Sequence, residues 1–219
     1  MIKNADLEAI ARGCPKIDQL RIDSCSRLYA FLPLKNLQRL NTLWVGPSRN
    51  FKDSQLGRVA KNGKLENLVL TGCVVTDLGI RYLSTTCRRI SQLSLCHTQV
   101  TDQGIECILT MCKDLNFLNA QSTSITNRSL QLIGTLALKL ETFHAQSCPE
   151  IDESGLELLL NARRARLNAG QPLPRLTLLT GGERGNPVSE DITERLDRQA
   201  DVCLINRSPL LALPASADV

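Results

Sequence analysis

The side chains in this sequence that are best suited to catalysis or metal binding are nine cysteines and two histidines. Cys96 and His97 are adjacent, which would suit a metal ligand pair or a thiol nucleophile beside a base. A zinc site needs about four such ligands, and neither a CxxC pair nor a second histidine pair accompanies them. The glycine-rich run at 181–185 lacks the Lys-Ser/Thr end of a phosphate loop. The spacing shows no nucleophile next to a general base that a third side chain orients, so the sequence predicts no catalysis, no metal and no cofactor.

The elements around these residues follow a repeat. Leu65, Ile90, Leu115 and Leu140 stand 25 residues apart, and Leu68, Leu93, Leu118 and Phe143 keep the same spacing. A fixed period in this range is typical of a solenoid. Each unit starts with alternating apolar and polar residues, which predicts a half-buried strand. Thr followed by Asp or Asn, at 76–77, 101–102 and 126–127, then predicts a helix start, so each unit is a strand, a turn and a helix.

Cysteines occupy two fixed positions of this unit, three residues before the strand (Cys14, Cys87, Cys112) and directly after it (Cys25, Cys73, Cys148), although Thr98 and Thr123 fill the second position in two units. Two weaker copies begin at 17 and 40. Over about residues 2 to 160 the sequence resembles the cysteine-containing subclass of leucine-rich repeats. The resemblance implies an α/β solenoid, a right-handed horseshoe with parallel strands on its concave face and helices on its convex face.

That subclass is most familiar as the substrate-binding part of F-box/leucine-rich-repeat receptors of SCF ubiquitin ligases. The resemblance therefore implies a non-catalytic module that holds a protein substrate for ubiquitin-dependent degradation. Skp1 and a cullin are expected as partners only if an F-box lies upstream, because none is visible in this sequence. The alternative is a free-standing repeat scaffold that binds partners outside ubiquitination.

The outward strand positions of the concave face are the predicted partner-binding residues. They are mostly uncharged and polar, with aromatic anchors, which is typical of a protein-binding surface. The candidates are Arg21, Trp44, Asn67, Val69, Gln92, Ser94, Phe117, Asn119, Thr142 and His144. For Trp44 the alternative is that it packs under a loop.

Composition narrows the class of protein further. The net charge is only +4 and is spread along the chain, so no nucleic acid partner is expected. No apolar run approaches the length of a membrane span. Cysteines that hold repeat positions favour a reducing compartment, the cytosol or the nucleus. The chain is expected to be a monomer.

Three segments are predicted. Residues 1–160 form the repeats, of which the first is truncated, residues 161–205 form an irregular last repeat and cap, and 206–219 form a disordered tail. In the cap, Leu173, Leu176 and Leu178 predict a strand 33 residues after that of Leu140, and Ser189 predicts the start of a helix that reaches Asp201. The arginines at 163, 164 and 166 are expected at a solvated helix end.

Overall fold

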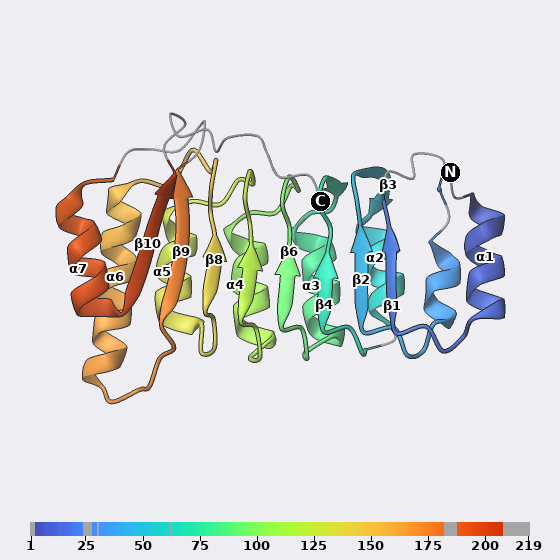
Figure 1. The fold of residues 1–219 in the computed structure, drawn as a ribbon, viewed down its shortest axis with the longest axis horizontal. Helices are drawn as coiled ribbons and strands as arrows, with labels where there is room; N and C mark the ends of the chain where they lie inside the picture. The colour runs from blue at the N-terminus through green and yellow to red at the C-terminus, as the bar shows by residue number, and fades with distance from the viewer. Residues whose placement is uncertain (1–2, 24–27, 30, 62, 182–187, 208–219) are drawn as a thin grey trace, which may run out of the picture.

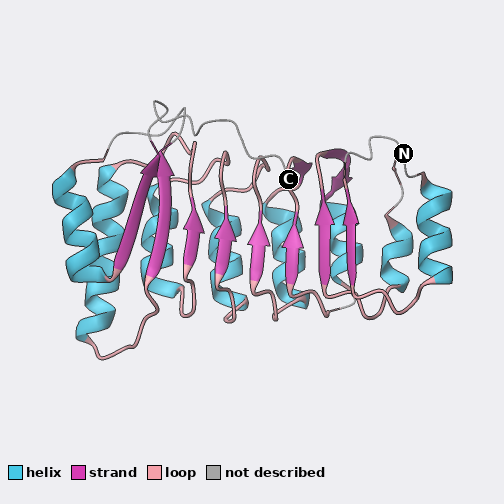
Figure 2. Cartoon of the chain, in the orientation of Figure 1, coloured by secondary structure: helices cyan, strands magenta, loops and turns pink. Residues whose placement is uncertain are grey.

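The computed structural model describes residues 3–23, 28–29, 31–61, 63–181 and 188–207. Eight of its strands form one sheet in the order β1-β2-β4-β6-β7-β8-β9-β10. All neighbouring pairs in this sheet are parallel. Helices α2 to α7 lie behind one face of the sheet and leave the other face open (Figures 1 and 2). This α/β repeat architecture is consistent with the predicted leucine-rich-repeat solenoid.

The strands of the large sheet are short because each spans only the alternating part of one unit. They are β1 (Gln19–Ile22), β2 (Thr42–Val45), β4 (Asn67–Val69), β6 (Gln92–Ser94), β7 (Phe117–Asn119), β8 (Thr142–His144), β9 (Leu176–Gly181) and β10 (Val202–Arg207). A second sheet, which the sequence did not predict, pairs β3 (Ser48–Lys52) with β5 (Cys73–Val74).

The helices follow the strands in each unit. They are α1 (Asn4–Gly13), the 3₁₀ helix η1 (Leu32–Asn36), α2 (Asp53–Ala60), α3 (Asp77–Thr86), α4 (Asp102–Met111), α5 (Asn127–Leu136), α6 (Glu153–Asn168) and α7 (Glu190–Ala200). The short η1 carries Pro33 in its first turn, where proline is tolerated because the N–H it lacks has no partner within the helix. Among the described residues, no helix combines the length and the apolar character that crossing a membrane requires.

The core is a column of aliphatic side chains in register across the sheet. Leu68, Leu93, Leu118 and Phe143 are paired from strand to strand, and all are fully buried. The next position in this column is Leu178, which is 35 residues after Phe143. The strand predicted from Leu173 was therefore placed in the wrong register, and Leu173 itself precedes β9.

Thiols and hydroxyls at the cysteine positions bind backbone carbonyls inside the stack. The Sγ of Cys148 donates to the Ala120 carbonyl oxygen over 3.2 Å, and the Oγ1 of Thr123 donates to the same oxygen over 2.6 Å. Thr and Cys at this position thus both bind a backbone carbonyl, but the threonine binds one in its own unit and the cysteine one in the preceding unit. Burial raises the pKa of Cys73 and of Cys112 to about 12, so these thiols are neutral donors. Cys14 is exposed, and Cys25 lies outside the described residues.

A ladder of carboxylates connects the helix starts of successive units. We call Asp53, Asp77, Asp102 and Asn127 the aspartate ladder. The Oδ1 of Asp77 accepts from the backbone N–H of Thr101 over 2.8 Å and from that of Gly104 over 3.0 Å, and its Oδ2 accepts from the Thr101 hydroxyl over 2.6 Å. Asp53 and Asp102 bind Thr76 and Thr126 in the same way. The ladder therefore satisfies the free amides at the start of each following helix.

The glycine in the T-D-x-G-I pattern makes room for this ladder. A Cβ at Gly104 would lie 2.6 Å from the Oδ1 of Asp77, closer than atoms can approach. In the next unit Ser129 takes this position, and its hydroxyl donates to Asp102. The predicted threonine caps are also present, since Thr76, Thr101 and Thr126 each accept from an N–H two residues on.

The C-terminal unit departs from the prediction in its arginines. Helix α6 continues to Asn168, beyond the boundary expected at 160. Only 1% of Arg163 and 9% of Arg166 is exposed, so the expected solvated helix end is wrong for both residues. Arg163 donates to the carbonyl oxygens of Ala200 and Pro174 over 2.8 and 2.7 Å. These arginines bind backbone carbonyls of neighbouring elements, which a local reading of the sequence does not reveal.

The end of the described chain adds a strand beyond the predicted elements. Ser189 caps α7 as predicted, with its Oγ accepting from the Ile192 N–H over 3.5 Å. After α7, β10 pairs with β9 and runs to Arg207. Residues 206 and 207, which were predicted to begin a disordered tail, therefore belong to β10. Residues 208–219 lie outside the described part of the chain.

Candidate protein-binding face

The open face of the sheet carries two rows of side chains in strand register. The first row is Gln19, Thr42, Asn67, Gln92, Phe117, Thr142, Thr177 and Cys203. The second row is Arg21, Trp44, Val69, Ser94, Asn119, His144, Leu179 and Ile205. All ten predicted partner-binding residues lie in these rows, so the structure brings them together on one face. Their role in binding stays a prediction.

Exposure varies along the rows. Arg21, Trp44 and Gln92 are exposed, whereas Asn67, Val69, Phe117, Asn119, Thr142 and His144 are half-buried. Ser94 is only 8% exposed, which leaves it little area for a partner. Contact with a partner would therefore rest on the larger side chains at and around Trp44 and Phe117.

The N-terminal end of the open face holds a hollow. Its volume is about 240 Å³, and its lining includes Arg21, Asp23, Trp44, Val69 and Thr71. The Arg21 guanidinium lies 5.0 Å from the centre of the Trp44 ring and also pairs with the Asp23 carboxylate. These two contacts fix the arginine over the indole. Trp44 is 39% exposed and lines this hollow, so it does not pack under a loop.

The centre of the open face is organised by contacts between neighbouring strands. The rings of Phe117 and His144 meet edge to face, with 5.2 Å between their centres. The Nδ2 of Asn67 donates to the Thr42 hydroxyl over 3.1 Å, and the Oδ1 of Asn119 accepts from the Gln121 N–H over 2.9 Å. These contacts reduce the conformational freedom that a partner would otherwise have to remove on binding.

Charge is nearly absent from this face. In the two rows, Arg21 is the only charged residue among the described positions, and Asp23 continues its strand. Beyond β1 the rows contain amides, hydroxyls, aromatic rings and aliphatic groups. Depletion of charge with aromatic enrichment is typical of the centre of a protein interface.

The sequence reasoning missed the C-terminal end of both rows. Leu179 and Ile205 extend the second row beyond His144, and Ile205 is 39% exposed. Leu179 was within reach, because buried Leu176 and Leu178 alternate with it. Ile205 was not, because its strand follows a helix and has no counterpart in the 25-residue period.

Cys96 and His97, the adjacent thiol and imidazole of the sequence, do not form a reactive centre. Cys96 is 8% exposed, and burial raises the pKa of its thiol, so it is not a poised nucleophile. His97 is exposed in the turn after β6. Within the described ranges, no three His, Cys, Asp or Glu side chains gather as a metal site would require. The open face presents a surface on which another molecule can pack.

Known structures share this fold. Neither a protein-family model nor a curated protein matches the sequence. Solved structures do match, among them a chain in the crystal structure of the Rad7 and Elc1 complex of yeast. The likeness has a TM-score of 0.62 at 14% identity and covers 94% of the present chain. The present chain spans 58% of the length of that chain, and at this identity the likeness concerns the fold.

Proposed function

We propose that this chain is a non-catalytic leucine-rich-repeat solenoid that binds a protein through the open face of its sheet. The observation that carries the proposal is the pair of rows that are uncharged beyond Arg21, anchored at one end by the Arg21–Trp44 hollow and in the middle by Phe117 and His144. Pre-ordered aromatic side chains among adaptable polar groups are where binding energy concentrates in protein interfaces.

Within this function, we infer that the bound protein is a substrate presented to an SCF-type ubiquitin ligase. Two observations support this step. The repeat pattern resembles the substrate-binding part of such receptors, and the fold resembles a chain crystallised in a protein complex. The whole protein's partners, including Skp1 and a cullin, belong to the proposal. A cytosolic or nuclear location belongs to it as well, because the buried cysteines serve as neutral donors that need no oxidising compartment.

The second candidate is a free-standing scaffold that binds its partner without ubiquitination. It rests on the same face and the same residues, and it requires no F-box. The two candidates differ only in what happens to the bound protein.

A double substitution tests the binding face. Trp44→Ala with Phe117→Ala should lower the affinity for a captured partner by at least about tenfold, because central aromatic residues dominate interface energies. Captured proteins are identified by quantitative mass spectrometry with wild-type and variant baits. Tyr29→Ala is the matched control, since Tyr29 is a 63% exposed aromatic residue outside the two rows. Capture that is equal for both baits would reject the open face as the binding surface.

A second measurement separates the two candidates. A partner that depends on Trp44 is followed in cells with and without the present protein. A ubiquitin-ligase receptor should shorten the partner's half-life, and proteasome inhibition should reverse this. An unchanged half-life, with capture intact, would favour the scaffold.

A further inference from the structure

The helix side of the molecule carries an apolar stripe that the open face does not explain. We define the helix-side stripe as three pairs of residues four positions apart on successive helices. They are Leu78 and Tyr82 on α3, Cys107 and Met111 on α4, and Leu132 and Leu136 on α5. Leu78 and Tyr82 are each 50% exposed, and the other four are half-buried. Residues four apart lie on the same side of a helix, so each helix carries its pair on one side. Tyr82, Cys107 and Leu132 occupy the same position of successive 25-residue units.

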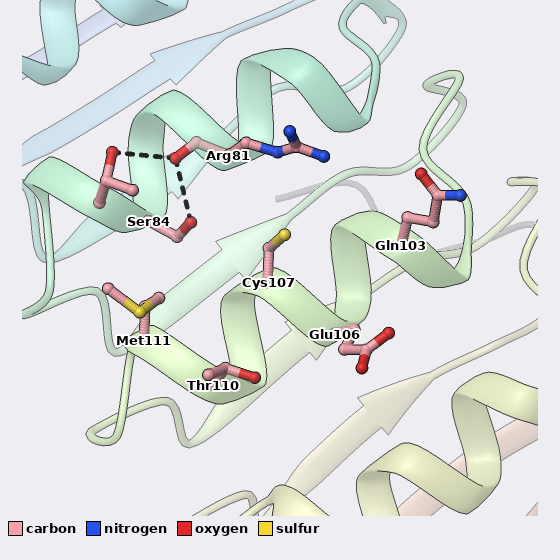
Figure 3. Close-up of a pocket in the computed structure, with 8 residues that line it drawn as sticks. Arg81, Ser84, Gln103, Glu106, Cys107, Thr110 and Met111 are labelled. Atoms are coloured by element: carbon pink, nitrogen blue, oxygen red, sulfur yellow. Dashed lines mark hydrogen bonds between the residues drawn. The ribbon is translucent and has the colours of Figure 1, made fainter.

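A groove crosses this stripe between α3 and α4. Its volume is about 390 Å³. It is lined by Arg81, Ser84 and Thr85 of α3 and by Gln103, Glu106, Cys107, Thr110 and Met111 of α4, and Figure 3 shows the two helices on either side of it. The hydroxyls of Ser84 and Thr85 donate to the Arg81 carbonyl oxygen over 3.2 and 3.0 Å. Their polar groups are thus satisfied within α3, and the groove presents mainly carbon and sulfur. Met and Cys are polarizable side chains that adapt to a bound surface.

The charged side chains at the groove determine which charge a bound partner should carry. Two charged side chains line the groove, Arg81 and Glu106. Glu106 is paired with Arg128, which lies outside the lining, over 2.9 Å. Among the ion pairs of the described residues, none involves Arg81 at the groove. A ligand here gains from carrying its own carboxylate.

We propose that the helix-side stripe binds an amphipathic α-helix of a partner protein. Its apolar residues enter the groove beside Cys107 and Met111, and a carboxylate next to them pairs with Arg81. A helix suits the site because it presents apolar residues three and four apart, and helix-in-groove docking reads such anchors. The stripe lies on the opposite side of the sheet from the open face, so this site adds a second partner to the proposed function.

Methionine methyl signals test this proposal directly. The chain has two methionines, Met1 and Met111, and Met111 is the methionine of the described residues, where it lines the groove. The full chain is labelled with ¹³C-methyl methionine and titrated with an 18-residue helical peptide that has leucine on one face and glutamate beside it. We expect the Met111 signal to shift and the Met1 signal to stay. An unmoved Met111 signal at millimolar peptide would overturn the proposal.

Charge reversal provides the specificity control. Arg81→Glu should lower the affinity for the glutamate peptide by roughly tenfold and raise the affinity for a matched lysine peptide, because like charges repel across an interface. Arg58→Glu makes the same charge change at an exposed position of α2 outside the groove, and we expect an effect of less than about twofold there. Circular dichroism confirms that both variants fold. Equal binding of the two peptides to the wild-type chain, or equal effects of the two substitutions, would contradict the assigned charge contact.

Discussion

Helix ends in the central repeats and in the C-terminal unit are satisfied by groups of opposite charge. In the central repeats, carboxylates of the aspartate ladder accept from the amides at the start of the next helix. In the C-terminal unit, guanidinium groups of α6 donate to carbonyls at the ends of neighbouring helices, including the Gly134 and Ala137 oxygens of α5 and the Ala200 oxygen of α7. Both arrangements solve the problem of unsatisfied backbone groups at helix ends.

The two arrangements differ in sequence separation and in solvent access. Contacts of the ladder carboxylates join residues 23 to 27 apart, from one unit to the next, and are half-buried. The contact of Arg163 with Ala200 spans 37 residues and is buried, and burial lowers the pKa of Arg163 to about 10. Arg163 therefore remains charged at neutral pH. Its N–H groups are the hydrogen-bond donors to the carbonyl oxygens of Ala200 and Pro174. The comparison indicates that the repeating part tolerates variation, whereas the terminal unit depends on single residues.

Loss of a buried arginine should have the largest effect. Arg163→Leu keeps much of the volume but leaves the carbonyls of Ala200 and Pro174 without their donor, which should cost about 3 kcal/mol of unfolding free energy. Urea denaturation measures this change. Arg164→Leu, at an exposed neighbouring position, is the control and should have little effect. Equal stability of the two variants would remove the contrast between the regions.

Removal of one step of the aspartate ladder should cost less. Asp77→Ala removes the acceptor of the Thr101 amide and leaves the Gly104 amide only the Thr101 carbonyl oxygen, and we expect a loss of about 2 kcal/mol, because water reaches part of the site. Asp77→Asn should retain part of the stability, since Asn127 fills the same position and pairs with Asp152. Asp114→Ala, which removes an exposed surface carboxylate, should be neutral in the same denaturation assay. A loss at Asp114 equal to that at Asp77 would show that the ladder has no special role.

The turn after each central strand offers a smaller, stabilising change. Gly72, His97, Ser122 and Ser147 follow one another every 25 residues, and all have positive φ, 56° at His97. Glycine adopts this conformation without strain, so His97→Gly should raise the unfolding free energy by about 0.5 kcal/mol. His97→Ala controls for loss of the side chain and should not stabilise. A calorimetric melt in which the glycine variant is no more stable than the alanine variant would show that these turns carry no strain.

The smallest expected effect concerns pH at the junction of the two regions. Hydrogen bonds from Ser154 and then Asn127 lower the pKa of the Asp152 carboxyl from its ordinary 3.8. A lowered carboxyl pKa stabilises the fold above the ordinary value, and this stabilisation is lost as the pH falls through the folded-state pKa. The stability difference between wild type and Asp152→Asn should therefore shrink in acid. Denaturation at pH 6 and at pH 3 measures it, and a constant difference would exclude the carboxylate as the cause.

The repeats were predictable because their signal is local and recurs. The apolar period determines which residues pair across strands, and the threonine caps depend on amides two residues away. The same register placed all ten candidate binding residues on one face. Even the smaller departures, such as Thr at the cysteine positions, still provide a buried donor to a backbone carbonyl.

What could not be predicted depends on contacts that appear only after stacking. Asp77 resembles an ordinary helix-start carboxylate in sequence, and its partners lie in the next unit. Arg163 and Arg166 resemble a solvated helix end until α5 and α7 pack against α6. The β3–β5 sheet and the groove beside Arg81 likewise arise from neighbouring units, and no periodicity marks them.

The aspartate ladder also follows the order in which the chain is synthesised. Each carboxylate belongs to an earlier residue than the amides it accepts from, so translation makes the acceptor before the helix that requires it. A nascent chain can complete each helix start as it leaves the ribosome, without waiting for later units. Trimming a unit from the N-terminal side would deprive the next helix of its acceptor, whereas trimming one from the C-terminal side of the ladder would only return a carboxylate to water.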